Sequence, residues 1–178
     1  MPFFHAYVIM DSMEIRRTEE RDIPAVMALY NSAKTYMQEN GFSQWTVVYP
    51  LAEDIIEDIK ASAGYVLTDG DEIVASACIL FGEDACYGEI DGAWINDRPY
   101  GVIHRIVVAP HKKGNDLAGL FLKEAVRQAK ALGVKDLRID THAKNMSMRK
   151  WIAKHGFAYC GIIHVEDGTP RFAYQKEL

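Results

Sequence analysis

One stretch of the chain combines residues that suit the binding of a phosphate group. It reads IVVAPHKKGNDLAG from Ile106 to Gly119 and predicts a strand, a basic turn and the start of a helix. Such a turn gathers unpaired backbone N–H groups at the positive end of the helix dipole, which favours an anion. The stretch contains neither a Gly-x-x-x-x-Gly-Lys-Ser/Thr P-loop nor a Gly-x-Gly-x-x-Gly dinucleotide motif. Taken alone, it is also compatible with an ordinary strand-to-helix turn.

Regular elements are predicted on both sides of this turn. In the C-terminal half they are strands over 102–109 and 136–141, helices over 117–132 and from Asn145 to Gly156, and a hairpin over 157–165 and 171–175. In the N-terminal half they are a strand from Met13, a helix capped by Asp22, a helix opened by Pro50, and a hairpin over 64–68 and 73–81. A strand, turn, helix and strand in that order indicate a right-handed βαβ crossover around the turn.

Length and composition indicate one domain with its own hydrophobic core. The chain has 178 residues, of which 49% are hydrophobic and 25% charged, so one domain over 13–178 is expected, with residues 1–12 as an extension or tail. The three cysteines form no CxxC pair, which favours a reducing, cytoplasmic setting and no thiolate metal site. The histidines lack metal-ligand spacing, so no metal is assigned. No apolar run is long enough to cross a membrane.

Charge is distributed unevenly along the chain. Residues 1–100 hold 6 of the 20 lysines and arginines and 18 of the 25 aspartates and glutamates, so the C-terminal half is basic. This asymmetry favours a cationic partner on one side and a phosphate-bearing one on the other, although two solvated faces would give the same pattern. The basic residues form no block or aromatic-interleaved stripe, so nucleic acid is not an expected partner.

Two motifs resemble those of the GCN5-related N-acetyltransferase (GNAT) superfamily. Val108-Ala109-Pro110 and then Lys113-Gly114-Asn115-Asp116-Leu117-Ala118 are similar to its Val-x-Pro-like step and Arg/Gln-x-x-Gly-x-Gly/Ala turn. The run from Asn145 to Phe157 resembles its later element, Asn-x-x-(small or Met)-x-x-apolar-Tyr-x-Lys-x-Gly-Phe. The resemblance covers 13–178. It implies an α/β (α+β) fold with a mixed, mostly antiparallel sheet of six to seven strands, a central splayed parallel pair and about four helices.

The resemblance also implies acetyl-CoA as the cofactor. In the family the amides of the turn hold the pyrophosphate, the pantetheine arm runs along the preceding strand, and an asparagine bonds the arm from the other side. The residues implied as cofactor-binding are Ile106, Val107, Val108, Lys112, Lys113, Gly114, Asn115, Asp116, Leu117, Ala118, Gly119 and Asn145.

Three residues depart from the family pattern. Lys113 replaces the usual Arg or Gln and loses its planar fork. Asp116 stands where glycine is preferred, and its carboxylate would repel pyrophosphate unless it points to solvent or caps the helix. Ile152 occupies the place where members often carry a tyrosine that protonates the departing thiolate. The substitutes for that tyrosine are Tyr159, Tyr174, Ser147, water, or departure of an unprotonated thiolate.

An alkyl ammonium group with a pKa near 10.4 must lose a proton before it attacks a thioester, so a base is expected. Asp140 lies where some family members carry a glutamate base. His104 and His142 have pKa values that start nearer neutrality, at about 6.5, and alternation places His104 on one face with Ile106 and Val108. Asp140 and His104 are the expected pair, although a histidine within a strand often has only a structural role. Arg105 is expected to face the other way and to pair with an acid.

The acceptor pocket of the family is usually built from the loop after the first helix and from the central strands. The candidate acceptor-binding residues are Gln44, Trp45, Tyr49, Asp91 and Trp94. Singly, each aromatic residue is equally compatible with core packing, but acidic and aromatic side chains together favour a cationic amine. A homodimer is compatible with the sequence.

Three functions are therefore weighed. The favoured one is transfer of acetyl from acetyl-CoA to a primary amine of a small molecule or peptide by direct attack, with the carbonyl oxygen held by a backbone amide near Val108. The alternative is a non-catalytic acyl-CoA-binding sensor or interaction module, which Ile152 and Asp116 favour. A generic nucleotide-binding protein would show no preference for acetyl-CoA.

Overall fold

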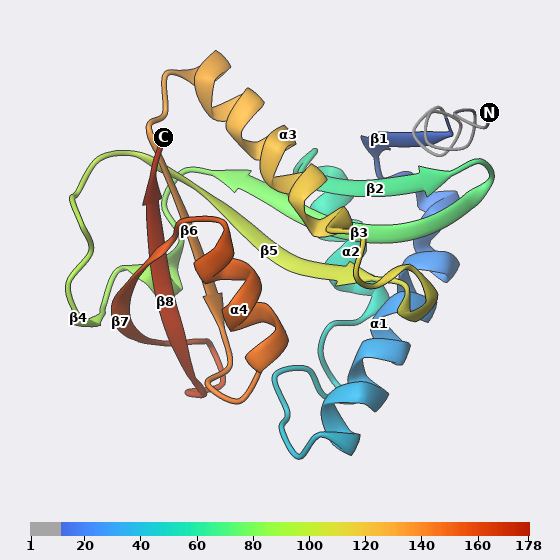
Figure 1. Cartoon of the computed structure of the whole chain (residues 1–178), viewed down its shortest axis with the longest axis horizontal. Helices are drawn as coiled ribbons and strands as arrows, with labels where there is room; N and C mark the ends of the chain where they lie inside the picture. Colours follow the sequence, from blue (N-terminus) through green and yellow to red (C-terminus); the bar gives the residue numbers. More distant parts are fainter. Residues whose placement is uncertain (1–11) are drawn as a thin grey trace, which may run out of the picture.

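A computed structural model describes residues 12–178, which form one mixed sheet of eight strands with four α-helices (Figure 1). The strand order is β1-β2-β3-β5-β6-β8-β7-β4. The strands are β1 (Met13–Arg17), β2 (Gly64–Asp69), β3 (Glu72–Phe81), β4 (Asp91–Gly92), β5 (Tyr100–Val108), β6 (Asp136–Thr141), β7 (Ala158–His164) and β8 (Pro170–Glu177). The helices are α1 (Ile23–Glu39), α2 (Ala52–Lys60), α3 (Leu117–Leu132) and α4 (Met146–Lys154), with short 3-10 turns η1 (Glu20–Asp22), η2 (Ala85–Tyr87) and η3 (Pro110–Lys112).

The predicted fold class is confirmed, and the elements around the basic turn lie where the sequence placed them. α3 and β6 have the predicted bounds, and Asn145 caps α4 by accepting a hydrogen bond from Met148 N at 3.2 Å. The sheet has eight strands rather than six or seven because the two-residue β4 adds to the edge beside β7. β1 begins at Met13 as predicted, but the tail assigned to 1–12 lies outside the described residues except for Ser12.

α1 starts after Asp22 as predicted, but its cap and the start of α2 differ from the prediction. The Asp22 side chain does not cap α1; it accepts two hydrogen bonds from Arg16 and one from Glu19 N. α2 begins at Ala52 instead of Pro50, because Asp54 at its third position accepts from Leu51 N and so fixes the start there.

The parallel strands β5 and β6 pair over only three residues. Tyr100, Gly101 and Val102 pair with Asp136, Leu137 and Arg138, and the two strands then diverge (Figure 1). Their C-terminal halves therefore leave a wedge-shaped opening in the sheet, with one edge of β5 lacking ladder partners. This is the splayed pair that the resemblance to the GNAT superfamily implied.

A β-bulge lies in β5 beside this opening. Ser76 pairs with Val107 and Cys78 with His104, so two residues of β5, Arg105 and Ile106, lie opposite one residue of β3. Arg105 has a φ of 51°, a left-handed conformation that costs a non-glycine residue roughly 1–2 kcal/mol. The extra residue inverts the alternation of side chains. The prediction that His104 shares a face with Ile106 and Val108 is therefore wrong, since the register places His104 on the face of Val107.

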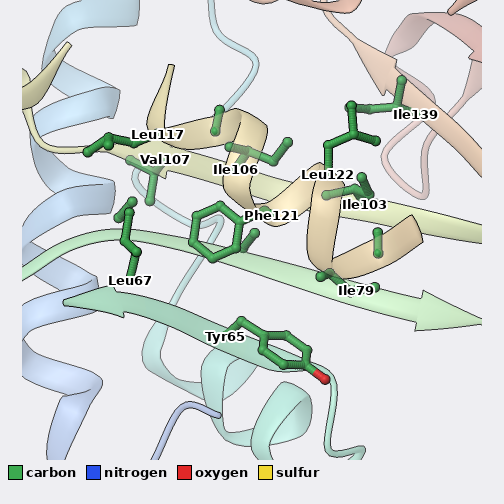
Figure 2. Packing of buried hydrophobic residues seen from close by; sticks show 14 of the residues in the cluster. Tyr65, Leu67, Ile79, Ile103, Ile106, Val107, Leu117, Phe121, Leu122 and Ile139 are labelled. Atoms are coloured by element: carbon green, nitrogen blue, oxygen red, sulfur yellow. The ribbon is translucent and has the colours of Figure 1, made fainter. Parts of the chain in front are cut away.

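The main hydrophobic core joins α3 to the central strands. Figure 2 shows Phe121 of α3 among the buried side chains of the central strands, and Phe121 has no exposed surface. α3 crosses in front of β3 and β5 in Figure 1, whereas α2 lies behind the sheet. This packing fixes the N-terminal end of α3 at the opening between β5 and β6.

Candidate active site

A groove of about 670 Å³ lies at the opening of the sheet. It is bounded by the C-terminal half of β5, the turn into α3, the start of α4 and the last turns of α1. Ten of the twelve predicted cofactor-binding residues line it: Ile106, Val107, Val108, Lys112, Lys113, Gly114, Asp116, Leu117, Ala118 and Asn145. Asn115 and Gly119 are the two predicted residues that do not line the groove. Asn115 donates to Lys112 O at 3.3 Å, and Gly119 is buried in the first turn of α3.

The mouth of the groove presents free backbone donors and positive charge. Within residues 12–178, the N–H groups of 114–118 donate to no backbone or side-chain acceptor, and the first bonded amide of α3 is Gly119 N, on Asp116 O at 2.9 Å. Lys112 is paired with Asp69 at 2.8 Å, whereas the Lys113 ammonium lies 4.2 Å from the centre of the Tyr36 ring. Lys150 and Lys154 line the groove from α4. The arrangement suits a phosphate-bearing ligand.

Asp116 neither caps the helix nor points freely into solvent. Its φ of 51° explains why glycine would be favoured at this position. Its carboxylate accepts from Trp151 Nε1 at 2.8 Å and contacts His155 Nε2 at 3.1 Å and Lys154 Nζ at 3.4 Å. Burial opposes the charge, but the hydrogen bonds from Trp151 and His155 outweigh it and lower the pKa of Asp116. The carboxylate is thus tied to α4, which reduces its repulsion of an anion at the helix mouth.

Gln44 holds the end of β6 to the start of α4. Its Oε1 accepts from Thr141 Oγ1 at 3.0 Å, His142 N at 3.2 Å and Asn145 Nδ2 at 2.9 Å. Trp45 is buried and packs edge-on against Tyr30, with ring centres 5.2 Å apart. These two predicted acceptor-binding residues therefore make structural contacts that shape one wall of the groove.

The structure does not bring Asp140 and His104 into direct contact. His104 Nε2 lies 2.9 Å from Asp84 Oδ2, and Asp140 Oδ1 accepts a hydrogen bond of 2.7 Å from the Tyr87 hydroxyl. The Tyr87 ring lies between the two groups, 6.1 Å from the His104 ring. The expectation that Asp140 is the carboxylate partner of His104 is thus wrong, because Asp84 occupies that position.

His142 lies apart from this pair. It follows the end of β6, stacks on Phe42 with ring centres 5.7 Å apart, and accepts at Nδ1 from Lys144 N at 3.1 Å. Burial, followed by the charges of Arg171 and Lys144, lowers the pKa of His142. These contacts fix the ring of His142 within the loop that precedes α4.

Arg105 points away from the groove and pairs with an acid, as the sequence predicted. Its guanidinium donates to Asp58 of α2 and to the Tyr49 hydroxyl, the latter at 2.9 Å. Burial opposes the charge of Arg105, but Tyr49 and Asp58 outweigh burial and raise its pKa. Burial also raises the pKa of Tyr49 despite Arg105. This ion pair anchors the bulge of β5 to α2 and brings Tyr49 beside the central strands.

A second hollow of about 530 Å³ lies under the segment between β3 and β5. Carboxylates and aromatic rings line most of it, together with Arg138, whose guanidinium lies 3.9 Å from the rings of both Trp94 and Tyr100. Its acidic and aromatic lining residues are Glu83, Asp84, Asp97, Tyr87, Trp94 and Tyr100. Of the predicted acceptor-binding residues, Trp94 belongs to this hollow, whereas Asp91 is exposed on β4 at the edge of the sheet.

Asp84 and Tyr87 are the residues that sequence reasoning missed. They lie in a loop-like stretch without periodicity, where nothing in the sequence indicates which side chains turn inward. The aromatic content of 82–100 was the signal that could have drawn attention to Tyr87.

Ile152, in place of the expected tyrosine, is fully buried in the core. Ser147 lines the groove from α4, while Tyr159 of β7 and Tyr174 of β8 pack edge to face, with ring centres 5.6 Å apart. Ser147 is the only one of the three hydroxyl substitutes that lines the groove within the described part of the chain.

Comparison with known proteins decides the family. The model of the Acetyltransferase (GNAT) family matches residues 25–157, three quarters of the chain. The protein belongs to the GNAT family. A search of curated proteins finds no match to this GNAT chain. The described residues contain no helix long and apolar enough to cross a membrane.

Solved structures share the fold over nearly the whole chain. A GNAT-family acetyltransferase from Streptococcus agalactiae is 32% identical, with a TM-score of 0.84 over 93% of this chain and 95% of its own. A candidate phosphinothricin N-acetyltransferase is 25% identical, with a TM-score of 0.63 over 94% and 99%. A candidate acetyltransferase from Salmonella typhimurium, solved with acetyl-CoA, is 16% identical, with a TM-score of 0.65 over 94% of both chains.

The cofactor of the GNAT family is acetyl-CoA, and the groove fits it. Five free amides and nearby lysines stand where a diphosphate would bind, and the edge of β5 that lacks ladder partners is available to an amide-containing arm. Asn145 and Ser147 face this edge across the groove. The residues present therefore suit the cofactor despite the departures at Lys113 and Asp116.

Proposed function

We propose that this protein is an acetyl-CoA-dependent N-acetyltransferase that acetylates a primary amine of a small molecule or peptide. The observation that carries the proposal is the placement of a base-bearing stretch of β5 directly before the cofactor groove. His104 precedes Ile106 by two residues across the bulge at Arg105, and the register places it on the face of Val107, which lines the groove. A proton-accepting group thus lies within reach of the end of the groove.

The cofactor supplies an activated acetyl group as a thioester. On the protein side, the amides of 114–118 and the lysines of the turn bind the diphosphate, and the backbone of Ile106 and Val108 orients the arm. The amide of Val108 is the candidate donor to the carbonyl oxygen. His104 and Asp140 are the candidate groups that receive a proton from the acceptor, and His142, which packs on Phe42, is the weakest of the three predicted bases.

The second hollow supports a cationic acceptor. Three carboxylates and three aromatic rings line it, and two of its residues, Asp84 and Tyr87, contact His104 and Asp140 directly. An ammonium group is attracted by carboxylates, and these carry the support, because the Arg138 guanidinium already covers the rings of Trp94 and Tyr100. Tyr49, which is partly exposed beside Arg105, can contact the acceptor from the α1–α2 side.

A non-catalytic acyl-CoA-binding module is the second candidate function. The buried Ile152 favours it, because this side chain cannot protonate a departing thiolate. A thiolate of pKa about 8.5 is nevertheless an acceptable leaving group near neutral pH, and Ser147 offers a hydroxyl in the groove.

Two measurements decide between these functions. Thermal-shift titration with acetyl-CoA, CoA and ATP should show stabilisation by acetyl-CoA and CoA but not by ATP. A thiol-release screen over amino acids, polyamines, aminoglycosides and peptides should then find turnover with at least one amine. Binding without turnover on any amine would favour the non-catalytic module, and stabilisation by ATP alone would exclude both.

A further inference from the structure

The segment between β3 and β5 contacts the base His104 with a carboxylate of its own. Asp84 stands before η2, and its two oxygens have separate partners: Oδ1 accepts from Cys86 N at 2.9 Å, and Oδ2 lies 2.9 Å from His104 Nε2. Tyr100 adds a further restraint, because its hydroxyl accepts from Asp84 N at 3.1 Å. Both carboxylate oxygens are therefore held, and the backbone of Asp84 is fixed as well, so the carboxylate cannot rotate freely.

This fixed carboxylate determines which nitrogen of His104 carries the proton. A carboxylate only accepts hydrogen bonds, so Nε2 must be the protonated nitrogen. The hydrogen bond from His104 lowers the pKa of Asp84 despite partial burial, which keeps the carboxylate charged. Among the described residues Nδ1 of His104 has no hydrogen-bond partner, yet it is not a buried atom. Nδ1 is thus the nitrogen that can take up a proton from outside.

The surroundings of His104 contain one charged group in direct contact. β3 places Cys78 opposite His104, the 82–98 segment supplies Asp84 and Tyr87, and β6 supplies Asp140 beyond the Tyr87 hydroxyl. Burial raises the pKa values of Cys78 and Tyr87, so both stay neutral at physiological pH. Asp84 is therefore the one charged group, among the described residues, that contacts the imidazole directly.

We propose that Asp84 is a positioning residue that holds His104 as the Nε2–H tautomer, so that Nδ1 serves as the base for the acceptor amine. This inference rests on the proposed N-acetyltransferase function. In the reaction, the ammonium group of the acceptor transfers one proton to Nδ1, and the amine then forms a C–N bond as the C–S bond of the thioester breaks. The amide nitrogen loses its second proton to water, and the thiolate takes one from solvent or from the imidazolium.

The test is ¹⁵N and ¹³C NMR of the histidine rings in the unliganded protein, which needs no acceptor. In the wild type we expect His104 to be the Nε2–H tautomer at high pH. Asp84→Asn keeps the cap on Cys86 N through its amide oxygen but turns an NH₂ group toward Nε2. The ring should then switch to the Nδ1–H tautomer.

Glu89→Gln is the matched control. It removes one exposed carboxylate from the same segment and should leave the tautomer of His104 unchanged. An Nδ1–H tautomer in the wild type, or no change of tautomer in Asp84→Asn, would overturn the inference whatever the activity. Two-dimensional amide spectra show whether each variant keeps the fold.

A kinetic measurement links the pair to the reaction. With the amine that gives the highest turnover in the screen, Asp84→Asn should lower kcat by about 10²-fold or more, because the wrong nitrogen is protonated. The KM for acetyl-CoA should stay unchanged. In the double variant His104→Ala/Asp84→Asn, kcat should be no lower than in His104→Ala alone. Additive losses would refute the pairing, whereas a wild type without turnover would refute the proposed function and leave the NMR result to decide the role of Asp84.

Discussion

Gly119→Ala tests whether the Asp116 carboxylate must stay tied to α4 for the cofactor to bind. A Cβ at position 119 would lie 2.9 Å from Asp116 Oδ2 and 3.1 Å from Oδ1, so the carboxylate has to move. Its contacts with Trp151, His155 and Lys154 would then loosen. We expect the displaced carboxylate to turn toward the mouth of α3, the proposed site of the diphosphate.

The effect on stability should be small because two contributions offset each other. Replacing glycine by alanine inside a helix stabilises it by about 0.8–1.0 kcal/mol. Loosening the partly exposed contacts of Asp116 costs about 1 kcal/mol. The midpoint of thermal unfolding should therefore change by only a few degrees, as measured by circular dichroism.

The effect on cofactor affinity should be larger. Two unit charges about 6 Å apart repel by about 0.7 kcal/mol in water and about 1.4 kcal/mol at an effective dielectric of 40. Summed over two phosphate charges, this weakens acetyl-CoA binding by about tenfold or more. Isothermal titration calorimetry at low and high salt measures the loss, which salt should reduce.

Asp116→Asn provides the control for this experiment. Without the charge, the double variant Asp116→Asn/Gly119→Ala should bind acetyl-CoA at least as tightly as the wild type. An unchanged Kd in Gly119→Ala, or an equal loss in the double variant, would refute the electrostatic reasoning and point to a steric effect on the helix.

Three further predictions concern stability. Phe121→Ala empties a fully buried site and should lower the free energy of unfolding by about 3–5 kcal/mol in urea titrations; a loss under 1 kcal/mol would contradict the packing of α3. Gln44→Leu leaves three donors without their acceptor and should lower the free energy of unfolding by about 2–3 kcal/mol. It should also increase amide hydrogen exchange at the start of α4, and unchanged exchange would contradict the role of Gln44 in holding α4 to β6. The hydrogen bond from Arg16 lowers the pKa of Asp22 below its ordinary value of 3.8, so this pair stabilises the fold above that pH and its contribution disappears as pH falls through the lowered pKa. The difference in unfolding free energy between wild type and Arg16→Gln should accordingly shrink from pH 6 to pH 2, and a constant difference would show that the ion pair is not its source.

Strong local patterns made much of the fold predictable. α3 combines an apolar stripe with a glycine after its last residue, and β6 alternates polar residues with Leu137 and Ile139, so both were predicted residue by residue. The basic turn was also located correctly, since helix N-termini offer amides whatever their side chains. Asn145 could be assigned as a cap because its type and position suffice for that role.

Features that depend on distant contacts could not be predicted. The bulge at Arg105 changes which side chains share a face, and no residue type at that position signals a left-handed conformation. Asp84 reaches His104 across a stretch without periodicity, so the sequence favoured Asp140, which lies in a recognisable strand. Asp116 finds its partners on α4, 35 to 39 residues away.

The separation of β5 from β6 after three paired residues gives the ligand a part in the architecture. An amide-containing arm that lies between the two strands would form hydrogen bonds with the edge of β5 that has no strand partner and so fill the opening in the sheet. Binding to the folded state alone stabilises it by about 2.7 kcal/mol at a ligand concentration one hundred times Kd. We therefore expect resistance to proteolysis to follow the acetyl-CoA concentration, so that starvation for the acyl donor would shorten the lifetime of the protein itself.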